Sequence, residues 1–150
     1  MQISEFLLPD DVIVGVRAPD KTRLLTELAG RAAAKLKLVP DDVAQAVLAR
    51  EQLGSTGMGG GVAIPHARIS SIKEPFGLLA CTQRPIAFDA VDGAPVDVLL
   101  LLLLPKDPAP DHLHALASAA RALRDAKAVR ALRKARDGTE AYNCLAGTER

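Results

Sequence analysis

A run of seven Val and Leu residues, Val98 to Leu104, restricts the folds open to this chain more than any other feature. The run is too short for a helix that crosses a bilayer, which takes about 20 residues. A strand of this composition is typical of a sheet covered on both faces, because the side chains on both of its faces are apolar. We therefore expect an α/β fold, with a buried strand over residues 96–104 and helices on both faces of a central sheet.

Apolar residues elsewhere recur at the spacing of amphipathic helices. One helix is predicted over residues 21–36, with Asp20 as its N-cap and Leu24 on its buried face. Pro40 suits the first turn of a second helix that extends to about Leu53. The other predicted elements are strands over 10–16 and 76–83 and helices over 112–123, 125–135 and 139–145.

The composition narrows the class of protein. Of the 150 residues, 49% are apolar and 25% are charged, which is the balance of a folded chain rather than of a disordered one. The net charge of +1 gives no field that would hold nucleic acid or an anionic membrane. No signal peptide or spanning segment is recognisable, and the two cysteines form no disulfide framework. We expect one domain over residues 1–150 in the cytoplasm, with no nucleic-acid partner and no membrane insertion.

A glycine-rich segment, Gly54 to Gly61, follows the second predicted helix. Glycine permits positive φ and lets backbone N–H groups converge on an anion, so the segment is either a phosphate-binding loop or a flexible connection. The nucleotide-binding motifs fail, because Gly60 stands where the Walker A motif has Lys. Ser55 and Thr56 would bind an anion or close a turn. Arg50, just before the segment, would bind phosphate or remain a solvated charge.

Three histidines are candidates for acid–base or nucleophilic chemistry: His66, His112 and His114. His66 follows an apolar run and Pro65, and ligands of open α/β sheets bind near such strand ends. His112 and His114 would lie about 200° apart on a helix, so they do not face one point. With Asp111 as N-cap, His112 would lie in the first helical turn.

These histidines leave different classes of function open. A metal-dependent hydrolase would use His66 with His112 or His114 and the carboxylate of Asp107 or Asp111, although no ligand-spacing motif supports such a site. An interaction module would use the same surface without any chemical modification. A phosphoryl carrier would need a nucleophilic histidine and groups that bind the spread negative charge of a phosphoryl group.

The segment from Glu51 to Ala67, E-Q-L-G-S-T-G-M-G-G-G-V-A-I-P-H-A, resembles the signature of the fructose/mannitol-type IIA domains of the bacterial phosphoenolpyruvate-dependent phosphotransferase system. It is most similar to the nitrogen-regulatory branch. The resemblance continues through residues 85–97 and 111–116 and covers residues 7–142. It implies a mixed sheet flanked by helices. Ala67 and Arg68 stand where many members have Gly-Lys, which leaves the preference for partners open.

The resemblance also implies the chemistry of the site. His66 would accept a phosphoryl group, on Nε2 in this family, with His112 and Arg50 as the other active-site residues. The phosphate-binding residues would be Gly54, Ser55, Thr56 and Gly57.

The implied donor is a histidine phosphocarrier protein, and the acceptor is a IIB domain or a regulatory target such as a transporter or a kinase. No cofactor and no metal is required, because the donor already carries an activated phosphoryl group. The protein would be an enzyme only as a phosphohistidine transfer component, with no turnover of a small molecule of its own.

Overall fold

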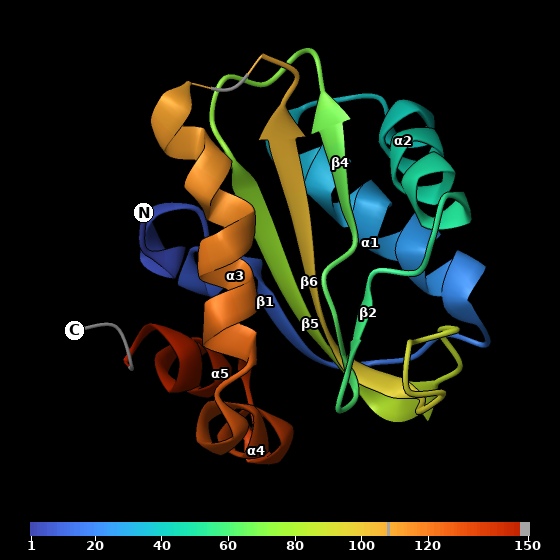
Figure 1. The fold of residues 1–150 in the computed structure, drawn as a ribbon, viewed down its shortest axis with the longest axis vertical. Coiled ribbons are helices and arrows are strands. Elements are labelled where there is room, and N and C mark those ends of the chain that lie inside the picture. The colour runs from blue at the N-terminus through green and yellow to red at the C-terminus, as the bar shows by residue number, and fades with distance from the viewer. Residues whose placement is uncertain (108, 148–150) are drawn as a thin grey trace.

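A mixed β-sheet forms the central layer of the computed structural model, which describes residues 1–107 and 109–147 and, at Asp111, the backbone alone (Figure 1). Its strands are β1 Val12–Val16, β2 Gly57–Gly59, β3 Val62–Ala63, β4 His66–Ile69, β5 Phe76–Ile86 and β6 Val96–Pro105. The helices are α1 Lys21–Leu36, α2 Pro40–Gln52, α3 Ala115–Leu123, α4 Ala126–Lys134 and α5 Gly138–Ala146. Short 3-10 helices are η1 Ile3–Glu5, η2 Pro9–Asp11 and η3 Pro110–His114.

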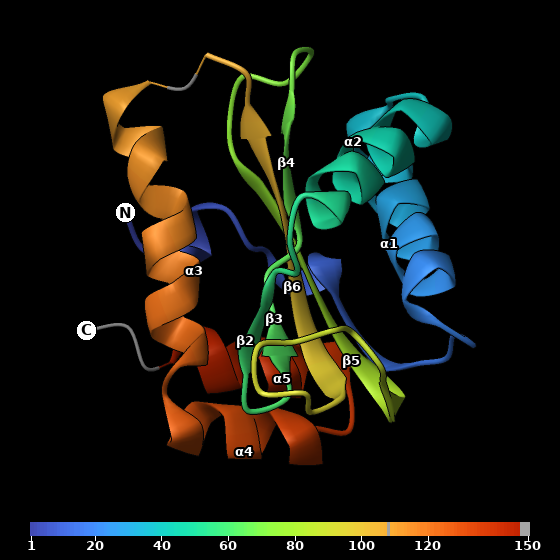
Figure 2. The same cartoon turned by 45° about the vertical axis from the view of Figure 1, so that its right-hand side comes forward.

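Strand β6 organises the sheet. It is antiparallel to β5 and parallel to both β3 and β4, and the latter two follow one another along the same side of β6. Strand β1 is parallel to β5, and β2 is antiparallel to β3, so the order is β1-β5-β6-β3-β2 with β4 paired to β6. Figure 2 shows α1 and α2 on one face and α3, α4 and α5 on the other, which confirms the predicted α/β fold.

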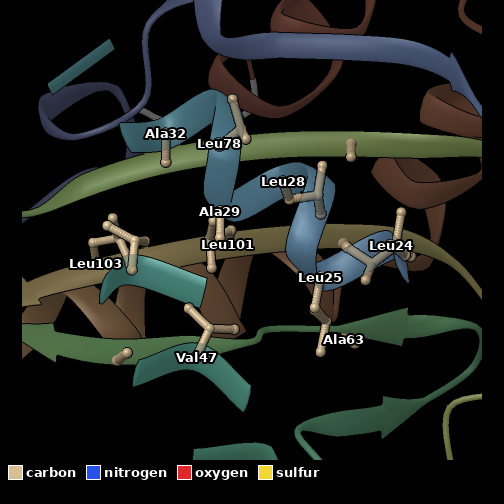
Figure 3. Packing of buried hydrophobic residues seen from close by; sticks show 14 of the residues in the cluster. Leu24, Leu25, Leu28, Ala29, Ala32, Val47, Ala63, Leu78, Leu101 and Leu103 are labelled. Atoms are coloured by element: carbon tan, nitrogen blue, oxygen red, sulfur yellow. The ribbon is translucent and has the colours of Figure 1, made fainter. Parts of the chain in front are cut away.

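The side chains of β6 alternate between two apolar clusters. Leu101 and Leu103 pack with α1 and α2, as Figure 3 shows, whereas Leu100 and Leu102 pack with α3, α4 and α5. All residues from Val98 to Leu103 are fully buried, so the Val and Leu run is apolar because both of its faces are covered. Among the described residues, no helix has both the length and the apolar composition that a bilayer-spanning segment needs.

Most helix starts follow local sequence signals. The side chain of Asp20 accepts the Arg23 N–H, which confirms it as the N-cap of α1. Pro40 occupies the first turn of α2, as predicted. Aspartates also cap α4 and α5, at Asp125 and Asp137.

Several predicted boundaries were wrong. The 3-10 helix η3 precedes α3, so Asp111 lies inside η3 and the residue before α3 is His114. The strand expected from residue 10 begins at Val12, because η2 comes first. The strand expected to end at residue 83 continues to Ile86, where it pairs with β6 again after an irregularity. The two-residue β3 and the four-residue β4 are too short to leave a periodic signal in the sequence.

Candidate functional site

His66 is the first residue of β4 and follows Ile64 and Pro65, the two residues between β3 and β4. It lies opposite Leu102, whose side chain belongs to the cluster on the α3 face of the sheet. Paired residues of neighbouring strands point to the same face, so the half-buried His66 ring lies on the α3 face.

The hydrogen bond of the His66 ring defines its tautomer. Nδ1 lies 2.9 Å from the carbonyl oxygen of Ile64. A carbonyl oxygen can only accept, so Nδ1 carries the proton and, in the neutral ring, Nε2 has the free lone pair. In this tautomer Nε2 is the ring nitrogen whose lone pair could attack an electrophile.

The two ends of the glycine segment lie in different places. The Ile64 N–H donates to the Thr56 carbonyl over 3.1 Å, so the proximal end, Gly54–Gly57, is bonded to the residue two positions before His66. The distal end, Gly59–Gly61, makes the turn between β2 and β3 with positive φ at all three glycines. The predicted phosphate-binding residues therefore lie near His66, and the remaining glycines serve the turn.

Glu51 accepts hydrogen bonds from several groups at the proximal end. Its side chain is 4% exposed and lies 2.9 Å from Lys21 Nζ. The Thr56 N–H is 3.3 Å from each carboxylate oxygen, and the Thr56 hydroxyl donates to the same carboxylate. The backbone carbonyl of Glu51 accepts the Gly54 N–H over 3.2 Å. These donors are directed into the protein.

A second set of bonds joins the proximal end to the segment between β5 and β6. The Ser55 hydroxyl donates to the Phe88 carbonyl over 2.8 Å, and the Gly57 N–H donates to the Ser55 oxygen over 3.1 Å. Lys21 Nζ donates to the same Phe88 carbonyl over 3.1 Å. In the described part of the chain, Ser55 N–H is then the one amide of Gly54–Gly57 without a partner.

Arg50 brings a positive charge to the same corner. It lies in the last turn of α2, whose C-terminal end is beside the passage from β3 to β4 in Figure 2. Its Nη1 donates to the Gly54 carbonyl over 2.9 Å, and no described carboxylate pairs with it. The other guanidinium N–H groups are free to bind an anion.

His112 is held by bonds of its own. Its ring, in η3, is 8% exposed; Nδ1 accepts the Ala109 N–H over 3.2 Å and Nε2 lies 2.9 Å from Glu74 Oε2. Both ring nitrogens of His112 are therefore bonded, Nδ1 to the Ala109 backbone and Nε2 to Glu74. Glu74 lies in the segment between β4 and β5, and no sequence signal marks it.

His114, two residues further along η3, is exposed, whereas His112 is buried, so the two side chains differ in environment as predicted. The described residues contain no group of three or more His, Cys, Asp or Glu side chains that could hold a metal ion. The side chain of Asp111, a ligand in the hydrolase alternative, lies outside the described part.

Perturbed pKa values occur at Asp92, beside the distal end, and at Cys81 in β5. Asp92 accepts the Gly60 N–H and the Ala94 N–H, and these bonds lower the pKa of its carboxyl. Burial, with the Asp97 carboxylate second, raises the pKa of the Cys81 thiol to about 11. Cys81 and Cys144 are both free thiols.

Sequence reasoning missed Lys21 and Glu51. Glu51 is part of the motif that carries the resemblance, and its being the one acidic residue of that segment is the signal that could have marked it. Lys21 is 30 positions away and has no such signal.

Comparison with known proteins gives a consistent set of relatives. The family model described as phosphoenolpyruvate-dependent sugar phosphotransferase system, EIIA 2, matches residues 5–147. A Nitrogen regulatory protein of Bradyrhizobium diazoefficiens is 40% identical over 146 residues, which cover 97% of this chain and 95% of the relative. A protein of the same name from Escherichia coli is 39% identical over 150 residues, with coverages of 99% and 92%.

Solved structures agree with these relatives. The crystal structure of nitrogen regulatory protein IIA-Ntr from Neisseria meningitidis has a TM-score of 0.88 at 33% identity, over 95% of this chain and 98% of that one. IIA mannitol from Escherichia coli has a TM-score of 0.72 at 20% identity, over 91% and 96%, and shows the shared fold alone.

Proposed function

This chain belongs to the EIIA 2 family of the phosphoenolpyruvate-dependent sugar phosphotransferase system, and on that premise we propose that His66 is the residue on which it carries a phosphoryl group. The family and its relatives support a phosphocarrier or regulatory role, not a metal-dependent hydrolase. The observation that carries the assignment to His66 is the bond of 2.9 Å from Nδ1 to the Ile64 carbonyl, which leaves the Nε2 lone pair free.

The proposed reaction moves a phosphoryl group between two histidines. The Nε2 lone pair of His66 attacks the phosphorus of a phosphohistidine on the donor. The donor's P–N bond breaks and its electron pair stays on the donor ring, while a P–Nε2 bond forms on His66. The Nδ1 proton remains in place, and the Ile64 carbonyl stabilises the positive charge that the ring acquires. The step needs no proton transfer and no nucleotide.

The phosphoryl oxygens need donors near Nε2, and we assign these to Arg50 and to the Ser55 N–H. Arg50 has unpaired guanidinium N–H groups, and the Ser55 amide has no other partner among the described residues. In this proposal Gly54, Thr56 and Gly57 contribute by fixing the backbone, since their N–H groups are bonded within the protein.

His112 would join this site by exchanging the exposed Glu74 side chain for a phosphoryl oxygen. Glu74 is 80% exposed, so breaking its bond to the His112 ring leaves no buried charge without a partner. After the exchange, the Nε2–H of His112, which now donates to Glu74, would donate to the phosphoryl oxygen.

The proposed partners are proteins. The donor would be a histidine phosphocarrier protein, and the acceptor a IIB domain or a regulatory target such as a transporter or a kinase. A solved complex of IIA mannitol with phosphorylated IIB mannitol of Escherichia coli, whose IIA chain is 20% identical to this one, supports the first kind of acceptor. The relatives named Nitrogen regulatory protein support the second. Leu53, 84% exposed beside Gly54, offers an apolar contact for docking. We place the protein in the cytoplasm as one IIA domain.

The test is transfer of labelled phosphate. The protein is incubated with phosphoenolpyruvate, enzyme I and a histidine phosphocarrier, and acid-labile phosphate is measured on the wild type, His66→Ala and the matched control His114→Ala. We expect label on the wild type and on His114→Ala and none on His66→Ala. Label that persists on His66→Ala would show that His66 is not the phosphorylated residue. A wild type that never becomes labelled would favour the alternative of an unmodified interaction module.

A further inference from the structure

The buried pair of Lys21 and Glu51 has no part in the proposed reaction. A carboxylate as buried as that of Glu51 is stable only where a cation and hydrogen-bond donors occupy its oxygens. Here the cation comes from the first residue of α1 and the donors come from Thr56 in the glycine segment. The pair therefore joins three separate parts of the chain at the proximal end.

A series of hydrogen bonds, linked through the backbones of Thr56 and Ile64, leads from this pair to the ring of His66. Glu51 holds the Thr56 N–H, and the Thr56 carbonyl accepts the Ile64 N–H over 3.1 Å. The Ile64 carbonyl then accepts Nδ1–H of His66 over 2.9 Å. Glu51 is thus connected, through Thr56 and Ile64, to the carbonyl that accepts the His66 proton.

Lys21 also controls the neighbouring residue of the segment. Its Nζ donates to the Phe88 carbonyl and lies 4.3 Å from the centre of the Phe88 ring. The same carbonyl accepts the Ser55 hydroxyl, so Lys21 and Ser55 share one acceptor. The free Ser55 N–H is thereby placed by contacts on both sides.

We propose that Lys21 and Glu51 are positioning residues for phosphoryl transfer: they hold Thr56 and Ser55 so that Ile64 keeps the His66 proton on Nδ1 and leaves Nε2 able to attack. This inference rests on the proposed function of His66. Neither residue touches the phosphoryl group, and both act through the backbone of the glycine segment and of β3.

Loss of the Lys21 charge has a defined consequence. Glu51 would be left buried without its cation, and it would take up a proton or draw in water. Thr56 and Ile64 would then be held less firmly, and the Ile64 carbonyl would no longer favour Nδ1–H. The ring would populate the other tautomer, in which Nε2 carries the proton and cannot attack phosphorus.

The experiment compares Lys21→Met, Glu51→Gln and the conservative Lys21→Arg with the wild type. The control is Glu27→Gln, which removes an exposed carboxylate that pairs with Arg31 at 3.3 Å on the outer side of α1. Nitrogen-15 NMR of the ring reports the His66 tautomer, and transfer from a phosphorylated histidine phosphocarrier gives kcat and KM.

In Lys21→Met and Glu51→Gln we expect a mixed His66 tautomer and a kcat lowered by about tenfold or more, with KM for the donor changed by less than about twofold. Lys21→Arg is expected to restore the Nδ1–H tautomer and most of the rate, and Glu27→Gln to match the wild type. Folded Lys21→Met with the wild-type tautomer and rate would overturn the proposal.

A double variant covers the case in which Lys21→Met does not fold. Lys21→Met with Glu51→Leu leaves no unpaired buried charge, yet it lacks the Thr56 anchor, so it should fold and still show the mixed tautomer. The ring measurement needs no phosphoryl donor. If the wild type accepts no phosphate, the proposed function fails while the tautomer shift still decides whether Lys21 and Glu51 position the ring.

Discussion

The two ends of the glycine segment are held by the same kinds of groups in different surroundings. At the proximal end, Gly54–Gly57, the anchoring pair is Glu51 and Lys21, with side chains 4% and 20% exposed. At the distal end, Gly59–Gly61, Arg133 donates to Asp97 and to the Gly60 carbonyl. The side chain of Arg133 is 36% exposed and that of Asp97 is 23% exposed.

Burial decides what each anchor does. An ion pair near water adds little to stability, because solvent and salt screen it. A buried pair adds little as a pair but costs several kcal/mol when one partner is lost, since the other charge stays without water. The proximal end is therefore held in one geometry, close to the histidine proposed to carry the phosphoryl group, and the distal end only closes a turn.

The largest expected effect is the loss of the buried cation. Lys21→Met should lower the free energy of unfolding by about 3 kcal/mol, because it leaves Glu51 without its partner. Urea unfolding followed by circular dichroism measures the change. The double variant with Glu51→Leu should recover most of the loss, and a Lys21→Met protein as stable as the wild type would erase the contrast between the two ends.

Alanine at one glycine of each end gives the next comparison. A Cβ at Gly57 would lie 2.7 Å from the Cβ and 2.9 Å from the Cα of Ala90, so backbone must move; we expect a loss of about 2 kcal/mol. A Cβ at Gly60 meets nothing within 4 Å, and its φ of +66° costs about 1 kcal/mol.

Thermal unfolding ranks the two glycine variants, and phosphate acceptance adds a second readout. Gly57→Ala should also accept phosphate more slowly, whereas Gly60→Ala should keep the wild-type rate. The reverse order in both measurements would show that the distal end is the constrained one.

The exposed pair at the distal end should matter less. Asp97→Asn removes the carboxylate that Arg133 binds through Nε and Nη2, and it should cost about 0.5 kcal/mol at low salt. Raising the salt concentration should shrink this difference, because the pair is screened. A loss as large as that of Lys21→Met, unaffected by salt, would contradict the distinction based on exposure.

The smallest effect is expected at Asp92, and it depends on pH. The Gly60 and Ala94 N–H groups lower the pKa of its carboxyl in the folded state. Its stabilisation is thus present above the pKa of the unfolded chain and is lost as the pH falls through the lower, folded value. The free energy of unfolding is measured for the wild type and for Asp92→Asn between neutral pH and pH about 3. The difference between the two proteins should shrink as the pH falls. A stability difference that grows in acid would contradict the lowered pKa of Asp92.

Much of this architecture could be predicted from short stretches of sequence. The Val and Leu run between Val98 and Leu104 required a strand covered on both faces, and Asp20 and Pro40 marked the starts of α1 and α2. These signals are local, because strand periodicity, capping and proline geometry depend on neighbouring residues. The motif from Glu51 to Ala67 likewise pointed to the family that the relatives share.

Contacts between distant residues could not be predicted in this way. Nothing in the sequence pairs Lys21 with Glu51, joins Ser55 to the Phe88 carbonyl or turns His112 towards Glu74. Burial and pairing of charges depend on which segments the fold brings together, and that is a property of the whole chain. The sequence by itself determined a sheet covered on both faces and a histidine close to the glycine segment. The tertiary structure decided how that segment is anchored, because the pair of Lys21 and Glu51 and the bond from Ser55 to Phe88 join residues that are distant in the sequence.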